Sequence, residues 1–500
     1  MAIPGVTQGE NARERETSVH LHGLVDTVLE EGNLDSAIRL LDRLRHPAYK
    51  PYGPHIRQLL YLALYPPVAD APDTALFGLD SIPSSPSKLA MRHRMSFSPS
   101  PAVIEAAQST LCAFVRTNTP ESICRALPNY GLTGLDDIPT ISTIAENNDD
   151  EGESELAKLS RRIKDARSCW DIIKQDYIKR GAVLDVPKNT RNRRSGRHTL
   201  EQDSFDFDEI SEPPQPVADN AWQVLEFLVS LFEKDQTATL AKYHIAFSPY
   251  FLAQIPSSRS TSGARWDVAA PLDVIFYCLE FPERWSLGAR LLTLLINLTN
   301  TIHIDLAMLL NAVTNRLLST PPEQIQTLFS LLPRSPDSWR FQLALCQLCL
   351  TDTPGGGAKP RARPQARGAP RPIPTQNNNE SSSKSTPLPN DAPTESKLAR
   401  KFPAIQITEA LRIFSIPLSP SSSDPMAMTR RLHLKFFLIE ALAELMATED
   451  RDAELVDIVQ SGKVAETINI AFKLPEGAVQ ESDVVLAEDL KAVLSLRHLS

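Results

Sequence analysis

Residues 287–350 decide the fold of this protein, and their sequence is LGARLLTLLINLTNTIHIDLAMLLNAVTNRLLSTPPEQIQTLFSLLPRSPDSWRFQLALCQLCL. Residues 287–298 are apolar nearly all round, which is typical of a buried helix. Residues 304–318 repeat their apolar positions with helical periodicity and predict an amphipathic helix. A Thr-Pro-Pro-Glu capping box at 320–323 then predicts the start of a helix that covers 325–332.

A fourth helix follows within the same stretch. The Ser-Pro-Asp sequence at 335–337 predicts its start, and apolar residues continue to position 350. Connections of about two to six residues force neighbouring helices to pack antiparallel. We therefore predict an all-α fold, a helical bundle or short α-solenoid. Its helix pairs would be of the HEAT, armadillo or tetratricopeptide-repeat kind, interrupted by long disordered loops.

A second helical pair is predicted near the N-terminus. One helical face collects the apolar residues Leu21, Leu24, Val25, Val28 and Leu29. Gly32 and Asn33 end that helix, and a second helix follows. The stretch GNLDSAI, residues 32–38, resembles the turn and second helix of one tetratricopeptide repeat. No second copy follows at the period of about 34 residues that such arrays have, so the resemblance implies an αα-hairpin only.

The chain alternates helical regions with polar stretches. Its 40 prolines exceed the usual share of about 5%, and they gather between the apolar stretches, which favours disordered connections. We predict an N-terminal helical hairpin region at 14–66, a helical region at 102–180 with one helix from 155 to 180, a central helical core at 216–352 and a C-terminal helical region at 403–500. We predict disordered stretches at 67–101, 181–215 and 353–402, and an acidic loop at 135–155.

Charge and cysteine usage indicate an intracellular protein. The net charge of −9 is modest for 500 residues, so the chain as a whole is not drawn to nucleic acid. Six scattered cysteines are too few for a disulfide framework, and residues 1–15 lack the apolar core of a signal peptide. The apolar stretch 291–313 contains Asn297, Asn300, His303 and Asp305, which are costly in a bilayer, so we expect no membrane span.

No catalytic or cofactor motif is present. The sequence lacks a phosphate-binding loop, a dinucleotide-type glycine triplet, a His-Glu-x-x-His motif and a Gly-x-Ser-x-Gly motif. We therefore predict no catalytic residue, no metal and no cofactor, and an enzyme with a dispersed site stays as an alternative. Cys346 and Cys349 have a metal-like spacing, but a zinc site needs four ligands, so we predict that they pack in the core. The ten histidines form no cluster along the chain, and the two-residue spacing of His20 and His22 does not bring their side chains together.

Two basic blocks are candidate interaction sites. The first is a candidate nuclear import signal and consists of Lys188, Arg191, Arg193, Arg194 and Arg197. Acidic residues follow it, so an ordinary solvated run is the alternative. The second is a candidate contact for nucleic-acid phosphates and consists of Lys359, Arg361, Arg363, Arg367 and Arg371. Its prolines also suit a polyproline-binding groove, and a linker without a partner is a third interpretation.

The polar stretches contain candidate phosphorylation sites. Kinases favour exposed serines and threonines beside basic residues or prolines, and the added charge can switch a contact. The candidates are Ser96, Ser98, Ser100, Ser195 and Thr386.

These observations favour a non-enzymatic helical scaffold or adaptor that binds other proteins inside the cell, with the nucleus favoured over the cytoplasm. Its linkers would be phosphorylated. The alternative is a nucleic-acid-associated factor that grips phosphate with its arginine-rich linkers. Nothing in the sequence sets the oligomeric state.

Overall fold

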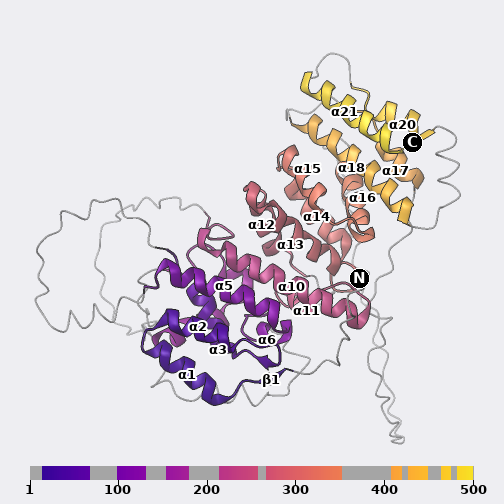
Figure 1. Ribbon diagram of the computed structural model, residues 1–500. Helices are drawn as coiled ribbons and strands as arrows, with labels where there is room; N and C mark the ends of the chain where they lie inside the picture. Colours follow the sequence, from indigo (N-terminus) through magenta and orange to yellow (C-terminus); the bar gives the residue numbers. More distant parts are fainter. Residues whose placement is uncertain are drawn as a thin grey trace, which may run out of the picture. The chain divides into compact units, whose positions relative to one another are not determined.

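The computed structural model describes residues 14–67, 98–130, 154–179, 213–256, 266–351, 407–418, 426–448, 463–474 and 481–498 (Figure 1). The fold is all-α, as predicted, and belongs to the class of helical bundles and solenoids. Among the described residues the strands are two short segments, β1 (Arg15–Glu16) and β2 (Tyr49–Lys50), which pair in parallel. No described helix has the length and apolar character needed to cross a membrane.

The chain divides into two compact units. Unit 1 contains residues 1–299 together with 330–332, and unit 2 contains residues 300–329 and 333–500. The boundary after Thr299 falls inside the range 216–352, which we predict to be a central core. The predicted domain ranges themselves stay predictions.

Unit 1 consists mostly of short helices, and its two longest described helices have 17 and 22 residues. In chain order its helices are α1 (Val19–Glu30), α2 (Leu34–Leu44), α3 (Gly53–Ala63), α5 (Pro101–Thr117), α6 (Pro120–Cys124), α8 (Glu155–Asp165), α9 (Cys169–Ile172), η2 (Asp219–Ala221), α10 (Trp222–Tyr243), α11 (Pro249–Leu252), α12 (Ala269–Cys278), η3 (Pro282–Arg284) and α13 (Trp285–Leu298). Helix α3 is central, because every side chain from His55 to Ala63 is buried. It packs against α5 and α8, and α10 packs against α5.

The N-terminal hairpin forms where the sequence predicts it. The hydroxyl of Ser18 accepts a hydrogen bond from the amide of Leu21 and caps α1. Gly32 has a φ of 77°, a left-handed conformation that glycine adopts without strain, and it turns the chain into α2. The predicted turn at Gly32 and Asn33 is confirmed.

The single helix predicted from 155 to 180 is wrong. Helix α8 ends at Asp165, and α9 is a separate turn that begins at Cys169. Two hydrogen bonds to Gln254 explain the break, because the amide of Cys169 donates to its Oε1 (2.8 Å) and Trp170 Nε1 donates to its carbonyl oxygen (2.9 Å). The indole of Trp170 thereby enters the core between Phe232 and Phe251. Burial of a large aromatic ring outweighs the continuation of one helix.

Helix α10 has no side-chain cap. Asp219 and Asn220 lie in the 3-10 turn η2 that precedes Trp222. The side-chain amide of Asn220 instead donates to the carbonyl oxygen of Leu64 at 2.5 Å, which ties this turn to the end of α3. The helix then runs to Tyr243.

A glycine allows α12 and α13 to pack closely. A Cβ atom on Gly288 would lie 3.0 Å from Cys278 Cβ and 3.2 Å from the carbonyl oxygen of Ile275. The buried helix predicted at 287–298 is confirmed. Because Gly288 has no side chain, the backbone of α13 can approach that of α12 closely.

Unit 2 contains α14 (Leu306–Leu317), α15 (Pro322–Leu331), α16 (Pro336–Thr351), α17 (Ile407–Phe414), α18 (Ala427–Thr448), α20 (Lys463–Ala471) and α21 (Glu481–His498). The three helices predicted between 304 and 350 are confirmed. Asp305 caps α14 by accepting from the amide of Ala307, and the two prolines precede or begin α15 as predicted. The long helices α16 and α18 pack along each other, and α21 packs on α18 (Figure 1).

A buried lysine joins three helices of unit 2. Lys435, on α18, is 1% exposed, and its ammonium donates to the carbonyl oxygens of Ile416 (2.5 Å) and Ala471 (2.8 Å). These acceptors lie at or just beyond the C-terminal ends of α17 and α20, where helical carbonyls lack internal partners. Burial lowers the pKa of Lys435 to about 8.

Candidate functional site

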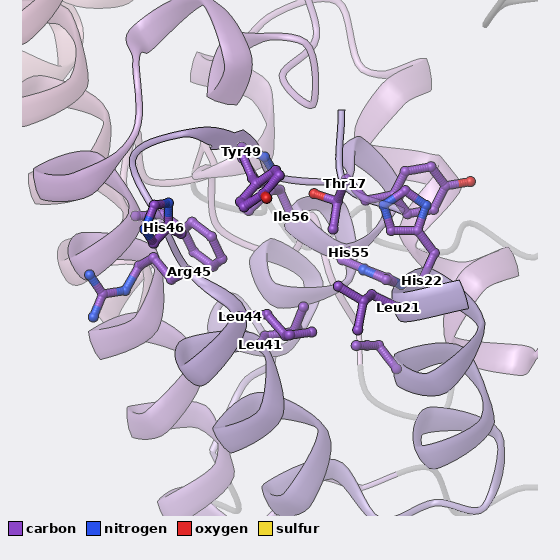
Figure 2. Close-up of a pocket in the computed structure, with 14 residues that line it drawn as sticks. Thr17, Leu21, His22, Leu41, Leu44, Arg45, His46, Tyr49, His55 and Ile56 are labelled. Carbon is purple, nitrogen blue, oxygen red and sulfur yellow. The ribbon is translucent and has the colours of Figure 1, made fainter. Parts of the chain in front are cut away.

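A small cavity in unit 1 is lined by three histidines, His22, His46 and His55, which are separated in the sequence. Figure 2 shows the rings of His22 and His55 on one side of the cavity and Arg45 and His46 on the other. Its volume is about 30 Å³. A water molecule needs about 10–15 Å³ of such space, whereas small-molecule sites have roughly 300–1,000 Å³. The cavity therefore has room for one or two waters.

Aromatic rings from α1 and from the start of α3 meet at this cavity. The His22 ring stacks on the ring of Tyr52, with centroids 4.1 Å apart and 17° between the planes. The His55 ring stands edge-on to both, with centroids 5.8 Å from His22 and 4.9 Å from Tyr52. These contacts join α1 to the first turn of α3.

The two histidines differ in their polar partners. His55 is buried, and its Nε2 lies 2.9 Å from Asp26 Oδ1, one helical turn after His22 on α1. The Nε2 of His22 is buried and has no hydrogen-bond partner among the described residues. Burial lowers the pKa of His22, and the neighbouring His55 lowers it further, while Asp26 and Glu16 act in the opposite direction. His22 is thus held towards its neutral form.

The pair of His55 and Asp26 has the geometry in which a carboxylate orients an imidazole. An acyl-transfer site would need a free nucleophile beside it. Thr17 carries the only alcohol hydroxyl among the residues that line the cavity, and it donates to the carbonyl oxygen of Lys50 at 2.6 Å. No cysteine lines the cavity. Asp26 therefore orients the imidazole of His55, but the described residues that line the cavity include no cysteine thiol and no free alcohol hydroxyl that could act as a nucleophile.

His22 and His55 meet in space although the prediction from spacing finds no histidine cluster along the chain. That prediction considered neighbours along the chain, and these residues are 33 positions apart. One signal in the sequence points to the site, because His22 precedes the buried Val25 and Leu29 by three and seven residues. A polar ring on the buried face of a helix needs a partner from another element.

A second, larger hollow in unit 1 has a volume of about 600 Å³. Its lining includes Pro67, Lys179 and Gln215, which lie at or close to the points where the chain enters or leaves segments outside the described residues. Its walls also include Asp219 and Asn220 from η2. The only charged groups among its described walls are Lys174, Asp176, Lys179 and Asp219, and their mixed signs favour no ligand class.

Most residues that the sequence analysis singles out lie outside the described residues. These are the import candidates Lys188, Arg191, Arg193, Arg194 and Arg197, the basic-contact candidates Lys359, Arg361, Arg363, Arg367 and Arg371, and the phosphorylation candidates Ser96, Ser195 and Thr386. Ser98 and Ser100 are described, and both are exposed. Ser100 caps α5, since its hydroxyl accepts from the amide of Val103 at 3.4 Å. Neither Ser98 nor Ser100 is among the described residues that line the cavity.

The cysteine pair lies in the core of unit 2, as predicted. Cys346 and Cys349 are buried on α16, and the Cys349 thiol lies 3.7 Å from Thr314 Oγ1 on α14. Burial raises the pKa of the Cys346 thiol well above its usual range, which disfavours the thiolate that metals bind. Within the described part of the chain, no three His, Cys, Asp or Glu side chains are placed to share a metal ion.

One helix of unit 2 carries exposed apolar side chains opposite its buried side. Helix α21 buries Ala487, Leu490 and Leu494. On the far side Val485 is 57% exposed, and Ala492 follows it seven residues later on the same face. We call the exposed side the outer face of α21 and define it by Val485, Ala492, Glu481, Glu488 and Asp489.

The described residues define an all-α protein of the helical bundle or solenoid class. Comparison of the chain with protein-family models, with curated proteins and with solved structures finds no match. Function is therefore argued from the chain's own residues.

Proposed function

We propose that this protein is a helical adaptor, and that the outer face of α21 binds a helix of a partner protein. The observation that carries the proposal is the exposed apolar strip of α21, which lies opposite the buried side of the same helix. A helix of this kind fits between two layers of a helical assembly, while a helix at the edge of an array has a polar outer side. Val484 and Val493, 44% and 37% exposed, widen the apolar strip on its two flanks.

Charge indicates the kind of partner. The outer face carries three exposed acids, Glu481, Glu488 and Asp489, beside its apolar residues. An amphipathic helix with an apolar stripe and flanking lysines or arginines would complement it. The proposed partner is therefore a protein that presents a basic amphipathic helix.

The test compares the wild-type chain with two charge-introducing variants. Val485→Glu places a charge in the centre of the outer face, and Val19→Glu introduces the same change at an 84% exposed position of α1. Quantitative affinity purification should show at least one protein that the Val485→Glu variant loses and the Val19→Glu variant retains. The purified pair should then bind directly, and binding should weaken at about 0.5 M salt because the complementary charges are screened.

Two outcomes would contradict the proposal. One is the recovery of the same proteins in the same amounts with all three chains. The other is turnover of a small-molecule substrate by the purified protein, lost on mutation of one acid or histidine, which would favour the alternative of an enzyme with a dispersed site.

The proposal places the adaptor inside the cell, with nuclear import through residues 188–197. Alanine replacement of the five basic residues there should shift a fluorescent fusion from the nucleus to the cytoplasm. The same replacement at the five basic residues of 359–371 is the matched control. If the control block moves the fusion instead, the import role passes to it. If neither does, the nuclear location is wrong.

A further inference from the structure

Four polar or aromatic side chains meet where α1 approaches the start of α3. His22 and Asp26 come from α1, and Tyr52 and His55 come from the start of α3; the rings of His22 and His55 are seen in Figure 2. We propose that these residues form a proton-sensitive clasp, which holds α1 on α3 while His22 is neutral and loosens when His22 takes up a proton. This inference does not depend on the proposed adaptor function.

The first argument is the missing acceptor at His22. A neutral imidazole carries one N–H group, and protonation adds a second. The Nε2 of His22 is buried and has no partner among the described residues, so an added proton there would be a buried donor without an acceptor. Such a group is costly, and the cost is larger for a charged group.

The second argument is that the nearby acids are already engaged. From α1, Asp26 Oδ1 is paired with His55. From β1, Glu16 Oε1 lies 3.0 Å from the Arg125 guanidinium and 3.7 Å from the Lys50 ammonium. Each acid already has a basic partner, so neither places an unpaired negative charge beside His22.

The remaining polar groups around the cavity offer no negative charge. From α3, His55 faces His22 directly, and the phenol of Tyr52 lies in the stack. From the end of α2 and the segment after it come Arg45, which is paired with Asp42 at 3.0 Å, and His46, whose Nδ1 accepts from the amide of Ala48. Tyr49 also lines this side. The Arg45 guanidinium is the positive group among these, and it disfavours an additional positive charge on His22.

The sign of the pH effect follows from these contacts. Because burial and His55 lower the pKa of His22, a chain with α1 detached binds the proton more strongly than the folded chain does. The stability contributed by a neutral His22 is therefore present above the ordinary histidine value of 6.5 and decreases as the pH falls through it. Loosening exposes the apolar floor of the cavity, which includes Leu21, Val25 and Ile56.

Hydrogen exchange measured by mass spectrometry on the full chain tests the clasp. Between about pH 7.5 and 5.5, after correction for intrinsic rates, the amides of α1 should exchange about threefold faster or more relative to those of α13. His22→Phe keeps a flat ring on Tyr52 but cannot titrate, so its α1 exchange should not depend on pH. His20→Phe, at an exposed position two residues away, is the matched control and should behave like wild type.

A second measurement decides the question if a variant fails to fold. NMR of the wild-type chain with labelled histidines should show His22 titrating below the ordinary histidine value of 6.5. The proposal is overturned if His22 titrates at that value or above it. It is equally overturned if α1 shows no pH-dependent opening, or if His20→Phe removes the opening and His22→Phe leaves it.

Discussion

Two bases whose nitrogen atoms are buried, Lys435 in unit 2 and His22 in unit 1, differ in their hydrogen-bond partners. Burial lowers the pKa of both groups. The Lys435 ammonium donates to two main-chain carbonyls, whereas His22 Nε2 faces no acceptor among the described residues. A satisfied base fastens helix ends together, and an unsatisfied one makes its contact dependent on protonation.

The largest effect is expected from removing the satisfied base. Lys435→Ala leaves two main-chain carbonyls without this donor, one of them buried, and opens a cavity where the lysine stem lay, so unit 2 should lose about 3–5 kcal/mol of stability. Lys435→Met fills the same space and should lose less, because relief of charge burial offsets part of the missing hydrogen bonds. Calorimetry of the full chains measures both. Equal melting temperatures for wild type and Lys435→Ala would show that the lysine fastens nothing.

Measurements at alkaline pH test the effect of burying Lys435. The folded chain releases the Lys435 proton near pH 8 and the unfolded chain near 10.5, so the wild type binds fewer protons when folded in this window. Its stability relative to Lys435→Met should therefore rise with pH, by roughly 2 kcal/mol between about pH 7 and 9.5. Lys473→Met, at an exposed site, should give a flat difference. If the stability of wild type relative to Lys435→Met fell as the pH rises, burial would not be what lowers the pKa of Lys435.

A smaller loss is expected at the edge of the clasp. Asp26→Asn replaces the carboxylate that lies 2.9 Å from His55 with a neutral amide. Asp26 is 42% exposed, so the substitution should cost only about 0.5–1 kcal/mol, seen as faster exchange of α1 at pH 7.5. A loss as large as that of Lys435→Ala would mean that Asp26, rather than the ring stack, holds α1.

The smallest effect is expected at His22 itself. His22→Phe at pH 7.5 removes a polar atom that has no partner and keeps an aromatic ring, so stability should change by less than about 1 kcal/mol in either direction. Thermal unfolding of wild type and variant side by side measures this. A loss of several kcal/mol would show that His22 has a buried partner after all, and the contrast with Lys435 would disappear.

Local sequence patterns predicted much of the helical framework and little of the cavity. The helix starts at Asp305 and Pro322, the turn at Gly32 and the burial of Cys346 depend on neighbours a few residues away. The contact between His22 and His55 depends on how two helices pack, and the spacing of residues along one helix does not predict that packing. The same holds for the break after Asp165, where Gln254 supplies both hydrogen bonds.

The amino-acid sequence by itself determined that this chain is helical and which faces of most helices are buried, because periodicity and caps act within a few turns. Tertiary structure alone decided that Trp170 interrupts a helix, that Lys435 ties the ends of two helices, and that His22 lies against His55 without an acceptor. Those outcomes depend on residues 19 to 85 positions away in the chain, whose approach is set by packing. Local propensity carries no information about such distant partners.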